Sequence, residues 1–378
     1  MRLWGRLRHE ERGISAVVAA ISIVGLFGAL VLSLDAGNLW SSKRAMVTAT
    51  DAGALVGART AESNGITTIG PCPQVVQDSV TTQMTANQPT ATLDACTLNP
   101  SNSKSGYITV DARKVVGTRF AGIFGFGDQS AFSSTSVAYG FPSGVTGLRP
   151  MGICILNDHV KEWVNLQNGV ITQAQYDALR GSNADHPVYA GAGVVHRILY
   201  TKQNAQSCGS SDATGNWGWQ DYNNGNNQTN DIRDWIQNGY SGVVGIHKPV
   251  PVCPQGTYDE PNGCVNGNTG SQGTSVDNQL QYLVDNHIHF AVPLFDAAVT
   301  GGGNTSTFTI RAFLGLVLWG FNSNGSESQR YLDVEFTSLQ VEGLCCNSNG
   351  TNTGVFSSTI CSTDHDPVST ATRCTPAS

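Results

Sequence analysis

The segment from Asp285 to Asp296 contains the residue types of a metal site. His287 and His289 are two positions apart, so both imidazoles would face the same side of a strand. Asp285 is nearby, and Asp296 could supply a third ligand. Alternatively, the two histidines form the solvent face of a strand whose other face is apolar. We favour this alternative and predict neither a metal nor a cofactor.

A second candidate is an aromatic group in a stretch rich in Gly and Asn. Trp217, Trp219 and Tyr222 could form a platform that binds a sugar, or they could anchor a loop on the core, where such rings bury a large area. The anchoring role is the prediction. The Asp-His-Asp run at 364–366 is expected to be solvated.

The motifs of several common enzyme classes are absent from the sequence. It has no Gly-x-Ser-x-Gly turn, no Walker loop and no His-Glu-x-x-His motif. We therefore predict no catalytic residues and no enzymatic activity. The net charge of −7 also makes nucleic acid an unsuitable partner.

Ten cysteines follow residue 34, and none forms a Cys-x-x-Cys pair. An even number without metal-binding spacing predicts disulfides in an extracytoplasmic compartment. Cys253 and Cys264 bracket a short loop and are the expected local pair. Cys345 and Cys346 are adjacent, which strains a direct bond, so each is expected to have a distant partner.

Residues 14–34 form an apolar run without a charge. As a helix, these residues would extend about 31 Å, which matches the hydrocarbon core of a bilayer. The apolar region of a cleaved signal peptide has about 7–15 residues and precedes a small-x-small site. This run is longer and lacks a good site, so a retained transmembrane helix is predicted.

Charges around this run predict its orientation. Four arginines precede it, at positions 2, 6, 8 and 12, whereas only Lys43 and Arg44 follow it closely. The positive-inside rule places residues 1–13 in the cytoplasm and the rest of the chain outside. That exterior part carries 17 of the 21 basic and 26 of the 28 acidic residues, so its net charge is about −9.

The next segment, residues 35–61, has no proline and is rich in alanine. Apolar and small side chains recur in it at the spacing of one helix face, so the membrane helix is expected to continue outward. Small residues such as Gly53 would let one face pack closely on the protein's own exterior domain or on a partner. Asp51 is expected on the solvent face or beside a neighbouring helix. Ser42 is expected to face away from the packed face.

The run GISAVVAAISIVGLFGALVLSLDAGNLWSSKRAMVTATDAGALVGA resembles the N-terminal region of TadG-like proteins of Flp (Tad) pilus assembly. The family pattern combines a Gly, an apolar span, Asp-x-Gly with an aromatic residue, and an Ala-rich segment around an Asp. Thr50 and Gly53 depart from it, since alanine is usual there. Residues 108–140 resemble the family's next element, with two strands and a short helix around 120–124. The matching residues of the first run are Gly13, Asp35, Gly37, Trp40, Asp51, Ala52, Ala54, Leu55, Gly57 and Ala58.

The resemblance implies a membrane-anchored component of a Tad pilus or secretion system, with the lipid bilayer and other Tad proteins or pilins as partners. Related pilin-like subunits are cut after a Gly that has Glu five positions later. Val18 stands at that position after Gly13, so no cleavage is expected. The chain also lacks the Asp-x-Ser-x-Ser metal site of von Willebrand A-type domains. The alternatives are a membrane-tethered adhesin or glycan-binding module and, third, a secreted-side hydrolase.

The expected fold class is α+β, with a single transmembrane helix that continues into a long helix before a disulfide-bonded region of mixed α/β structure. Residues 141–150 are expected to form a linker. Helices are predicted at 172–180, at 229–240 and after Ser275, and strands at 287–292, 312–319 and 331–336. The predicted regions are 1–13 (cytoplasmic), 14–34 (transmembrane), 35–148 (stalk and pilin-like unit), 149–344 (exoplasmic domain) and 345–378 (Cys/Ser/Thr-rich tail).

Overall fold

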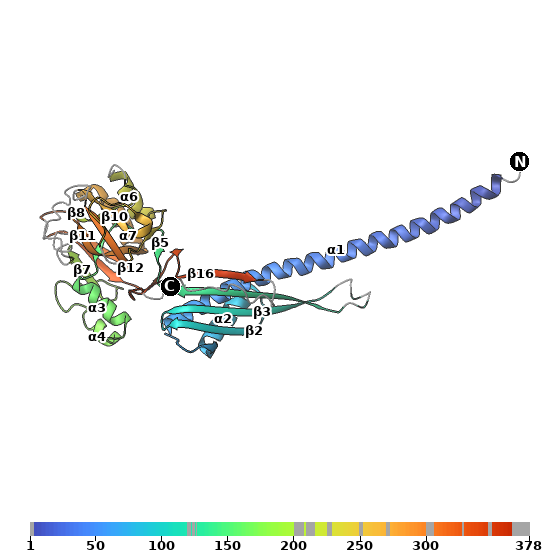
Figure 1. The fold of residues 1–378 in the computed structure, drawn as a ribbon, viewed down its shortest axis with the longest axis horizontal. Coiled ribbons are helices and arrows are strands. Elements are labelled where there is room, and N and C mark those ends of the chain that lie inside the picture. The colour runs from blue at the N-terminus through green and yellow to red at the C-terminus, as the bar shows by residue number, and fades with distance from the viewer. Residues whose placement is uncertain are drawn as a thin grey trace.

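A computed structural model describes residues 4–118, 122, 125, 127–199, 208, 216–224, 229–248, 252–269, 273–299, 306–326, 329–346 and 350–364. The fold is α+β, as predicted. One long helix projects from an elongated unit of helices and strands, which we call the stalk, and a second unit, the head, lies at the opposite end (Figure 1). Each unit has its own hydrophobic core.

Helix α1 (Trp4–Ser63) has 60 residues. No proline interrupts it, so every interior amide can donate to the preceding turn. Buried Thr50 donates its hydroxyl to the carbonyl of Met46 at 2.7 Å, which satisfies the side chain within the helix. The helix ends just before Gly65, whose φ of +59° is a left-handed conformation that favours glycine. The predicted continuous helix through residues 35–61 is confirmed.

The stalk sheet has six strands in the order β1-β2-β3-β4-β16-β14. Helix α1 crosses this sheet over β3, β4 and β16, and helix α2 packs beside it. A disulfide between Cys72 and Cys96 joins the chain after β1 to β2. The elements are β1 (Gly70–Pro71), α2 (Gln74–Asn87), β2 (Thr92–Asn102), β3 (Ser105–Val116), β4 (Gln129–Gly140), β14 (Leu339–Gln340) and β16 (Val355–Asp364).

Strand β16 belongs to the region predicted as a Cys/Ser/Thr-rich tail. It pairs antiparallel with β4, with Ser357 opposite Gly140 and Asp364 opposite Ser134. Backbone hydrogen bonds therefore order residues 355–364, and this segment returns from the head to the stalk. The predicted short helix at 120–124 lies mostly outside the described residues.

The head sheet runs β6-β11-β12-β10-β8, and β13 joins β12 to β7. Strand β12 is buried along most of its length and has paired strands on both edges, so the predicted central strand is confirmed. A small sheet β15-β5-β9 completes the described strands. The strands are β5 (Gly144–Val145), β6 (Ile153–Cys154), β7 (Val195–Leu199), β8 (Asn216–Asp221), β9 (Val244–Gly245), β10 (Cys264–Thr269), β11 (His289–Val299), β12 (Thr307–Asn322), β13 (Tyr331–Phe336) and β15 (Gly343–Leu344).

Helices cover the head sheet, and the three predicted helices are confirmed with shorter bounds. Helix α7 packs on β12 and α6 packs on α7, while Thr172 caps α4 through a reciprocal bond with Gln175. Gly239 follows α6 with a φ of +82°, as its helix-ending role requires. The helices are α3 (Asp158–Gln167), α4 (Gln173–Asp177), α6 (Thr229–Asn238) and α7 (Asp277–Asn286), with 3-10 turns η2 (Glu260–Asn262) and η3 (Gly273–Val276).

Four disulfides join described cysteines. The predicted bond between Cys253 and Cys264 is confirmed, and a further bond joins Cys154 to Cys208. The expectation of distant partners for Cys345 and Cys346 is wrong, because these neighbours pair with each other. The other described cysteines are in other disulfides and leave no distant partner for either.

Candidate functional site

Helix α1 contacts the stalk through one face of small side chains, which we call the seam. Alanines at its centre have no exposed surface, which places the helix axis close to β3, β4 and α2. Close approach of this kind is what small residues permit, so the predicted packing face is confirmed, and it packs on α2, β3 and β4 of the same chain. The seam consists of Met46, Ala49, Gly53, Ala54, Gly57, Ala58 and Ala61.

The two seam glycines lie where a side chain would collide. A Cβ at Gly53 would be 2.7 Å from Cγ of Met84, and a Cβ at Gly57 would be 2.6 Å from Cγ2 of Val80. Gly57 would also meet Cδ1 of Ile108 at 2.7 Å, so strand β3 and helix α2 both press on it. Glycine destabilises a helix by about 1 kcal/mol relative to alanine. The lack of room for a Cβ explains why glycine is nevertheless present at both positions.

Two polar residues of α1 differ from the expectations. The Oγ1 of Thr135, on β4, donates to Asp51 Oδ1 at 2.6 Å, so the partner of this aspartate is a strand and not solvent or a helix. Ser42 is only 9% exposed and lies on the packed side of the helix, one turn before the seam begins at Met46. Polar contacts therefore accompany the close packing of α1 along the sheet.

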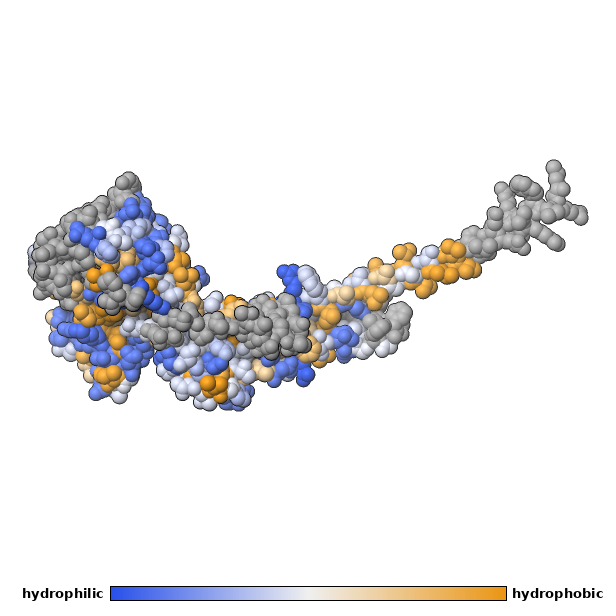
Figure 2. Space-filling model, in the orientation of Figure 1, coloured by the Kyte–Doolittle hydropathy of each residue, from blue (hydrophilic) through white to orange (hydrophobic). Residues whose placement is uncertain are grey.

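From residue 16 to residue 34, the described side chains of α1 are largely exposed. At glycines 25, 28 and 37, no atom lies within 4 Å of the position that a Cβ would take, and the helix is long and apolar enough to cross a membrane. Figure 2 shows a band of hydrophobic surface where this part leaves the stalk. Its exposed large side chains are Val17, Val18, Ile21, Ile23, Val24, Leu26, Phe27, Leu30, Leu32 and Leu34.

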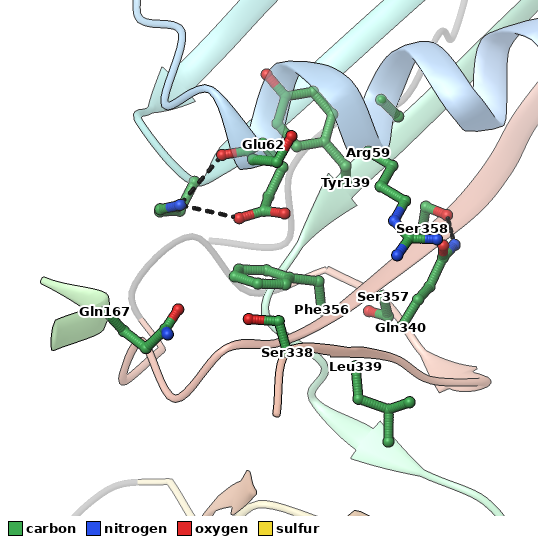
Figure 3. A pocket seen from close by; sticks show the side chains of 13 residues that line it. Arg59, Glu62, Tyr139, Gln167, Ser338, Leu339, Gln340, Phe356, Ser357 and Ser358 are labelled. Carbon is green, nitrogen blue, oxygen red and sulfur yellow. Dashed lines mark hydrogen bonds and ion pairs between the residues drawn. The ribbon is translucent and has the colours of Figure 1, made fainter. Parts of the chain in front are cut away.

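A cavity of about 200 Å³ lies where the end of α1 meets β14, β16 and the head (Figure 3). Glu62 and Lys104 form an ion pair at its edge, with Nζ 3.1 Å from Oε1, and the ammonium lies 5.6 Å from the ring centre of Phe356. Burial raises the pKa of Glu62, an effect that Lys104 opposes, and burial raises the pKa of Tyr139 to about 12. Glu62 and Lys104 neutralise each other, which suits a joint between stalk and head better than a reaction site.

The residues of the candidate metal cluster, at which no metal was predicted, are not brought together. Helix α7 ends at Asn286 and His287 adopts a left-handed φ of +45°, so only His289 belongs to the strand. The ring of His287 lies 4.4 Å from that of Trp319. Asp296 accepts from Nε of Arg311 at 2.6 Å, which neutralises its carboxylate.

The aromatic residues are anchors where the structure describes them. Trp219 and Tyr222 are buried, and the Tyr222 hydroxyl donates to the carbonyl of Arg149 at 2.9 Å. The side chain of Trp217 lies outside the described residues. Of the predicted 364–366 cluster, Asp364 ends β16, while His365 and Asp366 lie outside the described residues.

A group that sequence reasoning missed lies under α3. His159, Glu162, His186 and His196 each place one ligand atom within 4.8 Å of the others, and we call these four residues the histidine cluster. Burial, followed by the neighbouring histidines, lowers the pKa of His196 to about 2, so its ring is neutral. The one sequence signal was the spacing of His159 and Glu162, which places both on one face of a helix.

A second group of potential ligands is explained by a covalent bond. His247 lies near Cys253 and Cys264, but the two sulfurs form a disulfide and are not thiolates. A metal requires the thiolate, so this group is not a metal site.

The chain has no match among protein-family models, curated proteins or solved structures. Function must therefore be inferred from its own geometry and from the resemblance of its N-terminal run. Two features stand out. Helix α1 is bare and apolar before the stalk and closely packed within it, and the head holds the histidine cluster.

Proposed function

We propose that this protein is a membrane-anchored, non-enzymatic structural or assembly component of a surface filament system of the Flp (Tad) type. The observation that carries the proposal is the change along α1. Its first part presents apolar side chains with no protein partner, and its second part is buried in the stalk. A single helix thus joins a segment suited to lipid with a folded exterior domain.

Because α1 is continuous, it can act as a spacer of fixed length. At 1.5 Å per residue, the part from Asp35 to Ser63 extends about 43 Å, so the head would be held at a set distance from the bilayer. No loop or proline separates the apolar part from the stalk. The seam and the bond from Thr135 to Asp51 fix the helix on the sheet. Such an element suits a part that positions other subunits.

The resemblance to TadG-like proteins supports the filament class. Several matching residues have structural roles here: Ala54, Gly57 and Ala58 form the seam, and Asp51 binds β4. The shared pattern is thus explained by packing a membrane-emergent helix on a sheet. The glycan-binding alternative loses its basis in Trp219 and Tyr222, since both are buried.

The topology can be tested by cysteine labelling of intact cells. We expect a membrane-impermeant maleimide to label Gln173→Cys, an exposed position in the head, and to label Arg6→Cys only after permeabilisation. Disulfide-bonded native cysteines do not react, and the unmodified chain provides the background. Labelling of Arg6→Cys in intact cells would reverse the proposed orientation.

The functional class can be tested by deletion in the cells that make the protein. We expect loss of surface filaments, seen by electron microscopy, and recovery when the wild-type chain is restored. A chain that ends before β16 is not a suitable control, because β16 completes the stalk sheet. Filaments of normal number and length without the protein would rule out an assembly role.

A further inference from the structure

We propose that His159, Glu162, His186 and His196 bind a zinc ion that ties α3 and the following loop to strand β7. This site goes beyond the proposed assembly role and does not depend on it. His159 and Glu162 lie on α3, His186 on the loop after α4, and His196 on β7. Three imidazoles and a carboxylate are ligands that zinc takes in proteins.

The distances within the cluster fit an ion better than direct hydrogen bonds. Glu162 Oε2 lies 3.3 Å from His159 Nδ1, 3.4 Å from His186 Nε2 and 3.6 Å from His196 Nδ1. Charge-assisted hydrogen bonds are about 2.7–2.9 Å long. A tetrahedral zinc ion with bonds of about 2.0–2.1 Å places its ligands about 3.3 Å apart, close to the observed spacings.

The three rings also surround a common point. The ring centroids of His159, His186 and His196 are separated by 5.1, 5.0 and 5.1 Å, a nearly equilateral triangle. The carboxylate of Glu162 contacts all three rings, so the four ligands enclose one space. This arrangement is compatible with tetrahedral coordination by four protein ligands.

Neighbouring groups hold two of the rings in the orientation that a metal needs. His186 Nδ1 lies 3.1 Å from Asn183 Oδ1, which can only accept, so Nδ1 carries the proton and Nε2 presents its lone pair to the cluster. On His196, Nε2 lies 2.7 Å from the Tyr176 hydroxyl, which leaves Nδ1 facing the cluster. Metal-bound histidines usually bond through their second nitrogen in this way.

One nitrogen of the histidine cluster is buried without a hydrogen bond within the described structure. The side chain of His196 is fully buried, and its Nδ1 has no hydrogen-bond partner. Buried polar atoms are seldom left unpaired, so this atom needs an explanation. It is also the atom that faces Glu162, so an ion at the centre of the cluster would satisfy it.

Exposure of the ligands indicates the role of the site. The side chains of Glu162 and His159 are 32% and 17% exposed, whereas those of His186 and His196 are 4% and 0% exposed. An ion can therefore enter from the side of α3. Four protein ligands leave no position for a substrate, which is the pattern of structural zinc sites. The ion would fasten helix α3 to an edge strand of the head sheet.

The test uses the full chain in detergent, with any purification tag removed. We expect about one zinc ion per chain by elemental mass spectrometry, as for a single structural site. After chelation, Co²⁺ should give the visible absorption bands of tetrahedral coordination, and Zn²⁺ should raise the Tm of the metal-free protein. His186→Ala and Glu162→Gln should each lower zinc affinity at least tenfold, and Asn183→Ala should lower it about 10–100-fold.

The double variant His287→Ala/His289→Ala is the matched control, because it removes two exposed histidines outside the cluster. It should bind zinc like the wild type. Glu162→Gln keeps the size of a partly exposed side chain, so circular dichroism can confirm that it folds. The proposal is overturned if the wild type gives no tetrahedral Co²⁺ spectrum, or if folded Glu162→Gln and Asn183→Ala bind zinc as tightly as the wild type.

Discussion

Replacing Gly57 with leucine is expected to separate α1 from the stalk sheet. The new Cβ alone would lie 2.6 Å from Val80 and 2.7 Å from Ile108, and the rest of the side chain has no room beyond them. Overpacking of a core costs about 1–3 kcal/mol, and the upper end of this range applies because leucine adds four carbons. The better helix propensity of leucine offsets about 1 kcal/mol of this cost. We expect a net loss of about 2 kcal/mol, measured as faster proteolysis of the stalk and a lower Tm.

Gly37→Leu is the matched control, since it makes the same change in the same helix. No atom lies within 4 Å of a Cβ at Gly37, so its stalk should resist proteolysis as the wild type does. Gly57→Ala should fall between the two, because it adds only the first colliding atom. Equal Tm values for Gly57→Leu and Gly37→Leu would show that the seam does not restrain the helix.

The sequence predicts features that depend on neighbouring residues. The absence of proline and the recurrence of small residues in α1 indicated a continuous helix with a close-packed face. The long apolar run of β12 indicated a central strand, because only a strand buried on both faces tolerates it. The short loop between Cys253 and Cys264 also indicated that these two cysteines form a disulfide.

The features that were missed depend on residues far apart in the chain. The histidine cluster forms only when β7 packs beneath α3, and nothing in the residues around His186 indicates that contact. Strand β16 returns to pair with β4 across more than two hundred residues. His287 failed as a strand residue because α7 continues to Asn286, and an end of a helix is hard to place from sequence.

The largest loss of head stability is expected from Arg197→Met. Arg197 donates from Nε and Nη2 to the two carboxylate oxygens of Asp333, each at 2.8 Å, and Tyr189 donates to the same carboxylate at 2.7 Å. Asp333 is completely buried, so the variant would leave a buried charge with one neutral partner. Breaking such a pair costs about 3–5 kcal/mol, and the partial exposure of Arg197 places the expected loss near 3 kcal/mol.

This loss can be measured by urea unfolding, followed by the fluorescence of the tryptophans, most of which lie in the head. Arg113→Met removes a comparable cation from an exposed pair with Asp94 and should cost less than about 1 kcal/mol. The double variant Arg197→Met/Asp333→Leu removes both charges and should recover much of the loss, because no charge remains buried. If Arg197→Met costs no more than Arg113→Met, water reaches Asp333 and β7 is not held by this pair.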